Sequence, residues 1–403
     1  MVKIGTSFPI YFLICTKELQ IPFRTYNFPS KPYKNRSTIY LIGKRAQNNG
    51  SLWEVFCRFL LFLLQVKTLS LQNHPLMKRL FCTLLFAIFV QFLFANQPYH
   101  FSHLSVKDGL SQLNVTCIYQ DKLGYIWFGT RNGLNKFNGN SFEVYWNHAD
   151  NPHSISSNII NCMAEDAEGN LWVGTENGLN RLDKNKNEFK RYHINQQENK
   201  DKNKITSLCL DQQGTLWIGA ASEGLFAYTP QGDSLKNIST KELKGNWVND
   251  IIERDHKLYI ASYNKGLLIY DLQQQAVVRS FQQNSESLPI PSNRIRKVHI
   301  DRKGNIWLGN DTHGVYVIKH DPAEVVCYNT RNGLSNNNVR CINESPSGEI
   351  WIGTFDGLNI LNPVTNRIQT YRYGTQGTLH LQHSVRPDAN HLDRNVCRRY
   401  QLL

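Results

Sequence analysis

The sequence predicts an all-β protein, a β-propeller made of four-stranded antiparallel blades. One observation is a motif of the form Gly-x-x-Trp-x-Gly, which occurs five times along the chain and once more in a degenerate form. A second is that the residues before the motifs alternate between apolar and polar side chains, which is typical of a half-buried strand. A third is the composition, because 11% aromatic residues and 26 Gly favour a β-rich chain with many tight turns.

The aromatic residue of this motif sets the period of the repeat. Neighbouring copies are 42 to 48 residues apart, and five of the eight Trp in the chain occupy this one position. The ring residues are Trp127, Trp172, Trp217, Tyr259, Trp307 and Trp351. This period is that of a propeller blade. A two-helix repeat of similar length is excluded, because the units alternate with period two and contain several Gly turns.

Each unit divides into four expected strands. In the first unit an inner strand at 115–120 precedes a turn at 121–124, where Asp opens the turn and Gly supplies a positive φ. A second strand begins near Trp127, and a Gly-containing turn leads to a third strand, such as 179–182 in the second unit. An outer strand, such as 142–145, completes the unit. A four-stranded sheet buries little surface alone, so we expect the Trp rings to fill the contacts between blades.

Counting these units gives six complete blades within residues 96–373 plus an orphan closing strand at 99–104. Such a strand completes the last blade of a closed propeller, so a seven-bladed architecture is expected with its last blade incomplete. The next inner strand is due near Val385, but Pro387 and a polar run follow instead. Residues 374–403 are therefore predicted to be a degenerate tail, the start of an aborted seventh blade. We expect this chain to be poorly stable, because its closing strand has no intact partner.

The residues before the repeats indicate targeting. Residues 77–95 combine a Lys-Arg start, a sixteen-residue apolar stretch and a small residue at Ala95, as in a secretory signal peptide. The stretch is short for a membrane span. Met77 is then the expected start of translation, and residues 1–76 are predicted to be an N-terminal extension that is not native or is disordered. The alternative is a genuine N-terminal membrane region with two apolar segments.

The net charge of +13 does not indicate a nucleic-acid partner. Residues 1–95 hold 12 of the 45 Lys and Arg and only 2 of the 32 Asp and Glu, so the repeats themselves are close to neutral. Nucleic-acid binding requires basic residues clustered on the folded domain. We therefore expect no nucleic acid among the partners.

Four segments of the first unit carry a resemblance to a known family. Residues 108–111 read Asp-Gly-Leu-Ser, and they precede the turn at 121–124, the segment Ile-Trp-Phe-Gly-Thr at 126–130 and Gly-Leu-Asn at 133–135. This order resembles the two-component regulator propeller repeat, and the likeness covers roughly residues 99–386. It departs from the family pattern in residues 1–76 and in the blade that has Tyr259 in place of Trp.

The resemblance implies the periplasmic sensor region of a hybrid two-component system histidine kinase of Bacteroides type. Such sensors typically detect oligosaccharides and switch on genes for glycan utilisation through a phosphorelay. The full-length relative would be a homodimer in the inner membrane, with kinase, receiver and DNA-binding parts. No kinase His box, receiver Asp or membrane helix follows the repeats in this sequence, so we expect that this chain cannot signal alone, that it is not an enzyme, and that only a missing C-terminal region would reach the membrane.

Motifs that would carry chemistry are missing from the sequence. It has no Gly-x-Ser-x-Gly, phosphate loop, His-Glu-x-x-His or Cys-x-x-Cys motif, so no catalytic residue, metal ligand or cofactor is predicted. The Asp-x-x-Gly turns lack the Asp-x-Asp-x-Asp alternation of a calcium loop and indicate turn chemistry. Cys117, Cys162 and Cys341 each precede their Trp by ten residues, which favours buried thiols on equivalent inner strands over disulfides.

Two function classes remain open. One is a ligand-sensing module, and the other is a secreted propeller enzyme, a lyase or hydrolase with acidic and His residues at the central channel. Turns at 220–223, 262–265 and 310–313 are one residue longer than their counterpart at 130–132, so one face is remodelled in three consecutive blades. An enzyme should cluster its titratable groups there, whereas Glu223, Lys265, Asp311 and His313 are scattered. We favour sensing, and the candidate ligand-binding residues are Tyr263, Asn264, Asp311, His313, Phe355 and Asp356.

Overall fold

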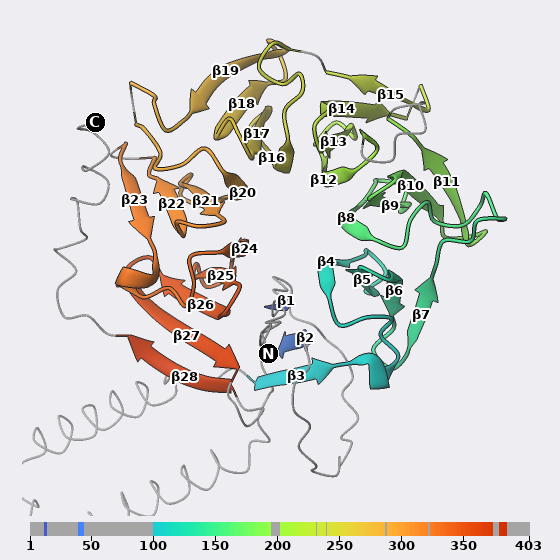
Figure 1. Cartoon of the computed structure of the whole chain (residues 1–403), viewed down its shortest axis with the longest axis horizontal. Helices are drawn as coiled ribbons and strands as arrows, with labels where there is room; N and C mark the ends of the chain where they lie inside the picture. The colour runs from blue at the N-terminus through green and yellow to red at the C-terminus, as the bar shows by residue number, and fades with distance from the viewer. Residues whose placement is uncertain are drawn as a thin grey trace, which may run out of the picture. The chain divides into compact units, whose positions relative to one another are not determined.

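The computed structural model describes residues 12–13, 39–43, 100–194, 202–230, 232–238, 240–286, 288–320, 323–373 and 379–384. Contacts divide the chain into two compact units, one made of residues 1–41 with 103–403 and the other of residues 42–102. The first unit contains six antiparallel blades built on four strands each, with a fifth strand added to the last, and the blades follow one another in chain order around a central axis (Figure 1). The predicted all-β propeller is therefore confirmed. No helix among the described residues is long and apolar enough to cross a membrane.

We letter the strands of each blade A to D from the axis outward, as Figure 1 displays them. Blade 1 comprises β4 (Val115–Gln120), β5 (Ile126–Thr130), β6 (Gly133–Phe137) and β7 (Phe142–Tyr145). Blade 2 comprises β8 (Ile160–Glu165), β9 (Leu171–Thr175), β10 (Gly178–Asp183) and β11 (Glu188–Tyr192). Blade 3 comprises β12 (Ile205–Leu210), β13 (Leu216–Ala220), β14 (Gly224–Thr229) and β15 (Ser234–Asn237).

The second half of the propeller repeats this order. Blade 4 comprises β16 (Val248–Arg254), β17 (Lys257–Ser262), β18 (Leu267–Asp271) and β19 (Ala276–Phe281). Blade 5 comprises β20 (Ile295–Ile300), β21 (Ile306–Asn310), β22 (Val315–Ile318) and β23 (Val325–Tyr328). Blade 6 comprises β24 (Val339–Glu344), β25 (Ile350–Thr354), β26 (Gly357–Asn362) and β27 (Arg367–Tyr373). Single 3-10 turns at Val106–Asp108 and Thr330–Asn332 precede the inner strands of blades 1 and 6.

Every inner strand starts with a β-bulge. In blade 1, Val115 pairs with Thr130 and Cys117 pairs with Gly129, so the residue between them faces no partner on strand B. The same shift of register occurs at the start of strand A in the other blades. Because a bulge bends the strand and turns one side chain out of the ladder, each blade presents one extra side chain at this end of strand A.

The Trp rings pack where one blade meets the next. Trp127 of blade 1 is 1% exposed and belongs to a cluster with Ile160 and Val173 of blade 2. Trp307 of blade 5 lies in a cluster with Ile352 of blade 6. Each junction between consecutive blades has an apolar cluster that combines residues of both blades. The prediction that these rings fill the contacts between blades is confirmed.

Strand B needs Gly beside the inner-strand thiols. A Cβ added at Gly129 would lie 2.5 Å from the Sγ of Cys117 and 2.8 Å from a methyl carbon of Ile160 in the next blade. At the equivalent Gly174, the space that a Cβ would need is occupied in the same way by the Sγ of Cys162. Both cysteines are free thiols, as predicted, and burial raises the pKa of Cys117 to about 12. These thiols therefore act as small apolar groups in the packing between strands A and B.

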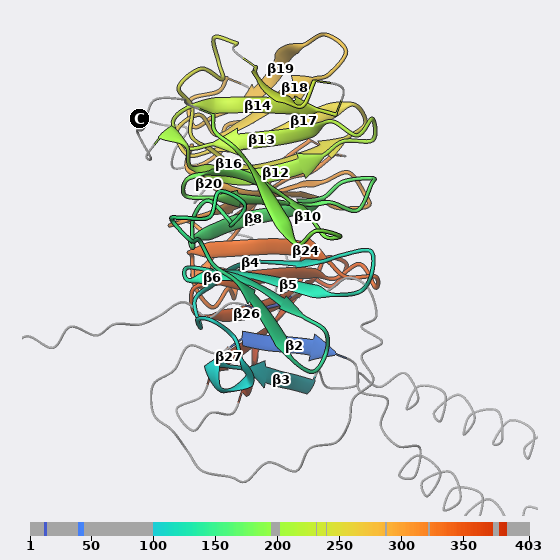
Figure 2. The same ribbon diagram turned by 90° about the vertical axis from the view of Figure 1, so that its right-hand side faces the viewer.

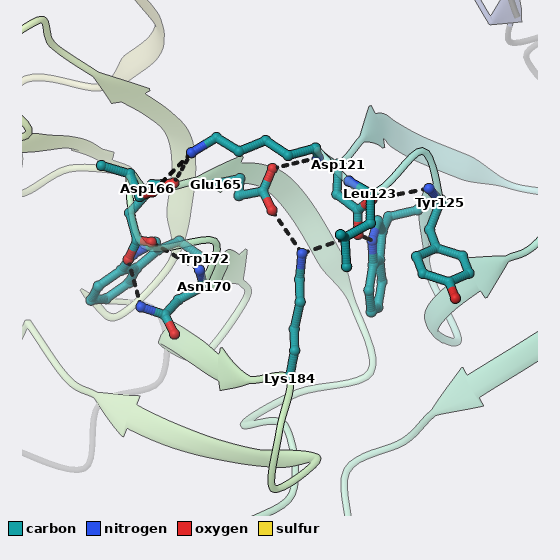
Figure 3. Close-up of polar contacts among 11 residues, drawn as sticks. Asp121, Leu123, Tyr125, Glu165, Asp166, Asn170, Trp172 and Lys184 are labelled. Atoms are coloured by element: carbon teal, nitrogen blue, oxygen red, sulfur yellow. Dashed lines mark hydrogen bonds and ion pairs between the residues drawn. The ribbon is translucent and has the colours of Figure 1, made fainter.

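A charged clamp joins blades 1 and 2 (Figure 3). The Nζ of Lys184, in the turn between β10 and β11, lies 2.7 Å from Oε1 of Glu165 and 3.0 Å from Oδ2 of Asp121 in blade 1. The backbone N–H of Lys122 donates to the other oxygen of Glu165 at 2.8 Å. Blades 5 and 6 have a matching contact, in which the N–H of Arg302 donates to Glu344 at 2.9 Å.

Two findings describe the ends of the propeller. The closing strand β3 (His100–Leu104) pairs with no strand of the six blades; it belongs to a three-stranded sheet of order β1-β2-β3, with β1 at Phe12–Leu13 and β2 at Ile39–Gly43. In the predicted tail, β28 (Leu379–Ser384) pairs antiparallel with β27 and makes blade 6 five-stranded. The tail therefore adds an outer strand to blade 6 where we expected a new inner strand. The signal-like segment 77–95 lies outside the described residues.

Candidate functional site

The strands run along the propeller axis, so the loops gather on two opposite faces (Figure 2). One face, which we call the B–C face, holds the turns between strands B and C and the residue just before each strand A. Backbone hydrogen bonds join these two positions within a blade. The N–H of Ala221 donates to the carbonyl of Lys204 at 3.0 Å, and the N–H of Tyr263 donates to that of Trp247 at 3.1 Å. The remodelled turns predicted from the sequence all lie on this face.

Blade 4 places two aromatic rings together on the B–C face. The ring centroids of Trp247 and Tyr263 lie 5.8 Å apart with an angle of 39° between the rings. Trp247 is 39% exposed and Tyr263 is 37% exposed, although most large apolar side chains of the propeller are buried. Contiguous exposed apolar surface is a feature of binding sites, whereas single exposed apolar residues are common on protein surfaces.

Cations from the neighbouring blades flank this pair. The Nζ of Lys204 in blade 3 lies 5.9 Å from the Trp247 ring centroid. The guanidinium of Arg294 in blade 5 lies 4.5 Å over the Tyr263 ring and donates to the Tyr263 hydroxyl. Such cation–π contacts are worth about 0.5–1 kcal/mol at exposed positions, so they orient the rings more than they stabilise the fold.

Two carboxylates hold the cations in place. Lys204 is paired with Glu176 of blade 2 at 2.9 Å, and Arg294 is paired with Asp311 at 3.2 Å. The result is a continuous line of side chains across four consecutive blades, which we call the aromatic row. It consists of Glu176, Lys204, Trp247, Tyr263, Arg294 and Asp311. Its centre is apolar and its ends are charged but locally neutralised.

A groove of about 590 Å³ adjoins the aromatic row in blade 4. It is lined by Asn264 and Lys265 of the B–C turn, by β18 and β19, and by Glu242. The Nζ of Lys265 donates to the carbonyl of Glu242 at 3.1 Å and fixes one end of this groove. Val278 of β19 is 42% exposed within it. An elongated ligand on the aromatic row could extend into the groove.

The structure brings together two of the six predicted ligand-binding residues. Tyr263 and Asp311 both contact Arg294, and Asn264 lines the adjoining groove. His313 is bonded through Nδ1 to the hydroxyl of its neighbour Thr312 at 2.7 Å. The other two lie in blade 6, where Phe355 is 5.7 Å from the guanidinium of Arg340, and Asp356 pairs with Arg372 at 3.4 Å.

The sequence did not predict Trp247, Lys204 or Arg294 as site residues. All three stand just before the first residue of an inner strand, a position that the repeat brings to the B–C face in every blade. A signal was present in Trp247, because it is one of the few Trp outside the repeated motif. Lys204 and Arg294 had no such signal, because each contacts an aromatic ring that belongs to a different blade.

If the protein were a propeller enzyme, the titratable residues of the longer turns should lie close to one another. Among the described residues, no hydrogen bond or ion pair joins any two of Glu223, Lys265, Asp311 and His313. No group of three or more His, Cys, Asp or Glu within that part of the chain could hold a metal ion.

The repeats match a known family model. The model for the two component regulator propeller matches residues 109–132, 154–177, 200–222, 289–312 and 333–356. The chain carries two-component regulator propeller repeats. Blade 4, where Tyr259 replaces Trp, is the blade that the model does not match. The resemblance stated from the sequence is confirmed.

Three known proteins are similar to this chain over part of their length. Histidine kinase P4 of Formosa agariphila is 48% identical over 61 residues, which is 15% of this chain and 4% of the kinase. The extracellular domain of the hybrid two component system BT3049 of B. thetaiotaomicron is 22% identical with a TM-score of 0.46, over 70% of this chain and 48% of that one. The extracellular domain of BT4673 from the same organism is 16% identical with a TM-score of 0.44, over 67% and 48%. The chain thus spans about half the length of these two domains.

Proposed function

We propose that this chain is the extracytoplasmic ligand-sensing propeller of a hybrid two-component system and that it binds an oligosaccharide on the B–C face. The repeat family, described as a two component regulator propeller, supports a sensor propeller. In such a system the bound oligosaccharide would control genes for glycan utilisation. The signal-like residues 77–95 support export to the periplasm.

The observation that carries the ligand class is the exposed pair of Trp247 and Tyr263. Sugar rings present apolar C–H faces together with hydroxyl groups. Flat aromatic side chains complement the first, and planar polar side chains complement the second. The aromatic row supplies both, because Lys204 lies beside the Trp247 ring, Arg294 lies over the Tyr263 ring, and Arg294 is paired with the carboxylate of Asp311. The rings are already oriented without ligand, which lowers the entropic cost of binding.

Calorimetric titration with a broad panel of oligosaccharides tests this function. We expect at least one oligosaccharide to bind, and W247A to weaken that binding by about 30-fold or more, as for a residue at the centre of an interface. The matched control is W146A, since Trp146 is 43% exposed but lies in blade 1, outside the aromatic row. The W146A variant should bind the oligosaccharide with the same affinity as the unmodified chain.

Two results would contradict the proposal. One is an absence of binding across the panel, and the other is turnover of any oligosaccharide by the purified chain. Turnover would favour the secreted lyase or hydrolase. Equal losses from W247A and W146A would show that the effect is not specific to the aromatic row.

A further inference from the structure

The outer edge of blade 4 differs from that of the other blades. Val278 of β19 faces no partner on β18, because the residues on either side of it pair with Ile269 and Tyr270, which are consecutive. The C–D pairings of the other five blades have no such shift of register. Bulges redirect a side chain and are common next to functional sites. Here the bulge residue is an exposed apolar side chain, in the blade that the family model does not match.

This bulge lies in the wall of the groove of blade 4. The walls come from β18 and β19, from the B–C turn and, with Glu242, from the segment after β15. The apolar part of the lining consists of Leu268, Val277 and Val278. A volume of about 590 Å³ accepts a ligand of about drug size, which for a carbohydrate is about two or three sugar residues. The groove is therefore large enough for a binding subsite.

The polar side chains that line the groove are not used by the propeller. Among the residues that the structure describes, the side chains of Glu242, Ser280 and Gln282 form no hydrogen bond or ion pair. Arg279 forms no ion pair within that part of the chain, and its guanidinium lies 4.5 Å over the Phe281 ring. These four side chains supply a carboxylate, a hydroxyl, an amide and a guanidinium, which can both accept from and donate to sugar hydroxyl groups. Together with the apolar lining they match the two kinds of surface that a sugar ring presents.

One turn carries both the aromatic row and the groove. Tyr263 of the aromatic row is followed directly by Asn264 and Lys265, which line the groove. The hydroxyl of Ser262 accepts the N–H of Asn264 at 3.2 Å and that of Lys265 at 3.1 Å. The same hydroxyl donates at 2.6 Å to Oδ1 of Asn246, which is buried just before β16. These bonds fix the backbone of the turn, so the aromatic row and the groove are presented together.

We propose that the groove is a second subsite of the sensor and that the propeller recognises a linear oligosaccharide of about four sugar residues or more. The first sugars stack on Trp247 and Tyr263, and the following ones lie on Val278 with their hydroxyl groups bonded to the polar lining of the groove. This inference rests on the proposed function, because the aromatic row supplies the first subsite. Two weak subsites joined by one ligand bind it more tightly than either alone, since the second contact is intramolecular. Chain length then decides which oligosaccharides are sensed.

The test is a set of calorimetric titrations of the full chain with length ladders. The probes are the disaccharide, trisaccharide, tetrasaccharide and hexasaccharide of β-1,4-linked galactose, xylose and mannose. Where another glycan binds most tightly in the calorimetric panel, the same lengths of that glycan are added. We expect affinity to rise about tenfold or more from the disaccharide to the tetrasaccharide, because the longer ligand spans both subsites, and to level off once both are filled.

Variants then assign the gain to the groove. V278K places a charge in its apolar wall, so we expect the tetrasaccharide to bind about tenfold more weakly and the disaccharide, where its binding is measurable, to bind as before. W247A should instead weaken both lengths. The matched control is V364K, since Val364 is also an exposed Val but lies between β26 and β27, on the opposite face. If V278K does not fold, as judged by its thermal melt, Q282A gives the same comparison.

The outcomes separate the two proposals. Equal affinity along every ladder that binds, or equal affinity of V278K and V364K for the tetrasaccharide, would overturn the groove as a subsite. The sensor function would stand in that case if W247A still weakens binding. Failure of every oligosaccharide to bind would overturn the sensor function itself.

Discussion

The Asp that opens the turn between strands A and B uses both of its carboxylate oxygens. Oδ1 of Asp121 accepts the N–H groups of Leu123 and Tyr125, which shapes the turn. Oδ2 accepts the indole N–H of Trp127 at 2.9 Å. The same bond to Trp recurs from Asp166, Asp211 and Asp301. One side chain therefore fixes both the turn and the ring that separates two blades, which is why Asp is the residue of this position.

Asp211 offers a test of this dual role, because it is 6% exposed and accepts from Gln213, Thr215 and Trp217. D211A should lower the free energy of unfolding by about 3 kcal/mol, since a buried indole N–H and two turn N–H groups lose a charged acceptor. The measurement is the urea unfolding midpoint.

The matched control is S345A. Ser345 takes the place of Asp in blade 6. From the backbone of its turn, the Ser345 hydroxyl accepts one hydrogen bond, from the N–H of Glu349 at 3.0 Å. Its loss should cost about 1 kcal/mol or less. Equal effects of D211A and S345A would show that the bond to Trp contributes nothing.

At the scale of elements, the blades are joined by charge as well as by apolar packing. Lys184 is 20% exposed, whereas its partners Asp121 and Glu165 have side chains that are almost completely buried. Desolvation lowers the pKa of Lys184, but hydrogen bonds and charge from Glu165 and Asp121 outweigh it and raise the pKa above its usual value. Lys184 therefore stabilises the junction of blades 1 and 2 only while it is charged.

K184M should lower the free energy of unfolding by about 3 kcal/mol at pH 7, because it leaves two carboxylates buried without a cation. K186M is the control, since Lys186 is exposed in the same turn. Urea unfolding at several pH values measures both.

The pH dependence of the unmodified chain follows from the same raised pKa. A Lys whose pKa is higher in the folded state contributes stability that is fully present below its ordinary pKa of about 10.5 and is lost as pH rises through the folded value. The unmodified chain should therefore lose stability above pH 10.5 by more than K184M does. Parallel pH profiles for the two proteins would contradict this account of the clamp.

At the scale of the whole molecule, the propeller was predictable because the same sequence motif recurs in each blade. Six copies of one motif gave the period, and period two gave the strands. Trp127 and its equivalents could be placed between blades for the same reason. The partners of β3 were not predictable, since β1 and β2 lie in a segment without any repeat. The pairing of β28 with β27 was not predictable from the repeat, because its period places the start of an inner strand near Val385.

The candidate site was only partly predictable, and the reason is again repetition. Tyr263 and Asp311 stood out because their turns are longer than the turn at 130–132. Lys204 and Arg294 occupy the position just before strand A, which holds five different residue types in the six blades, so no repeated pattern distinguishes them. They become a site only when the fold brings blades 3, 4 and 5 side by side.

Hydrogen–deuterium exchange with and without bound oligosaccharide tests the central claim, that the B–C face is the sensing surface, most directly. The ligand is the oligosaccharide that binds most tightly in the calorimetric panel. We predict protection in peptides that span 242–265 and 293–313, which contain the residues of the aromatic row in blades 4 and 5. Protection confined to the opposite face, in the A–B turns at 121–124, 211–214 and 301–304, would contradict the account.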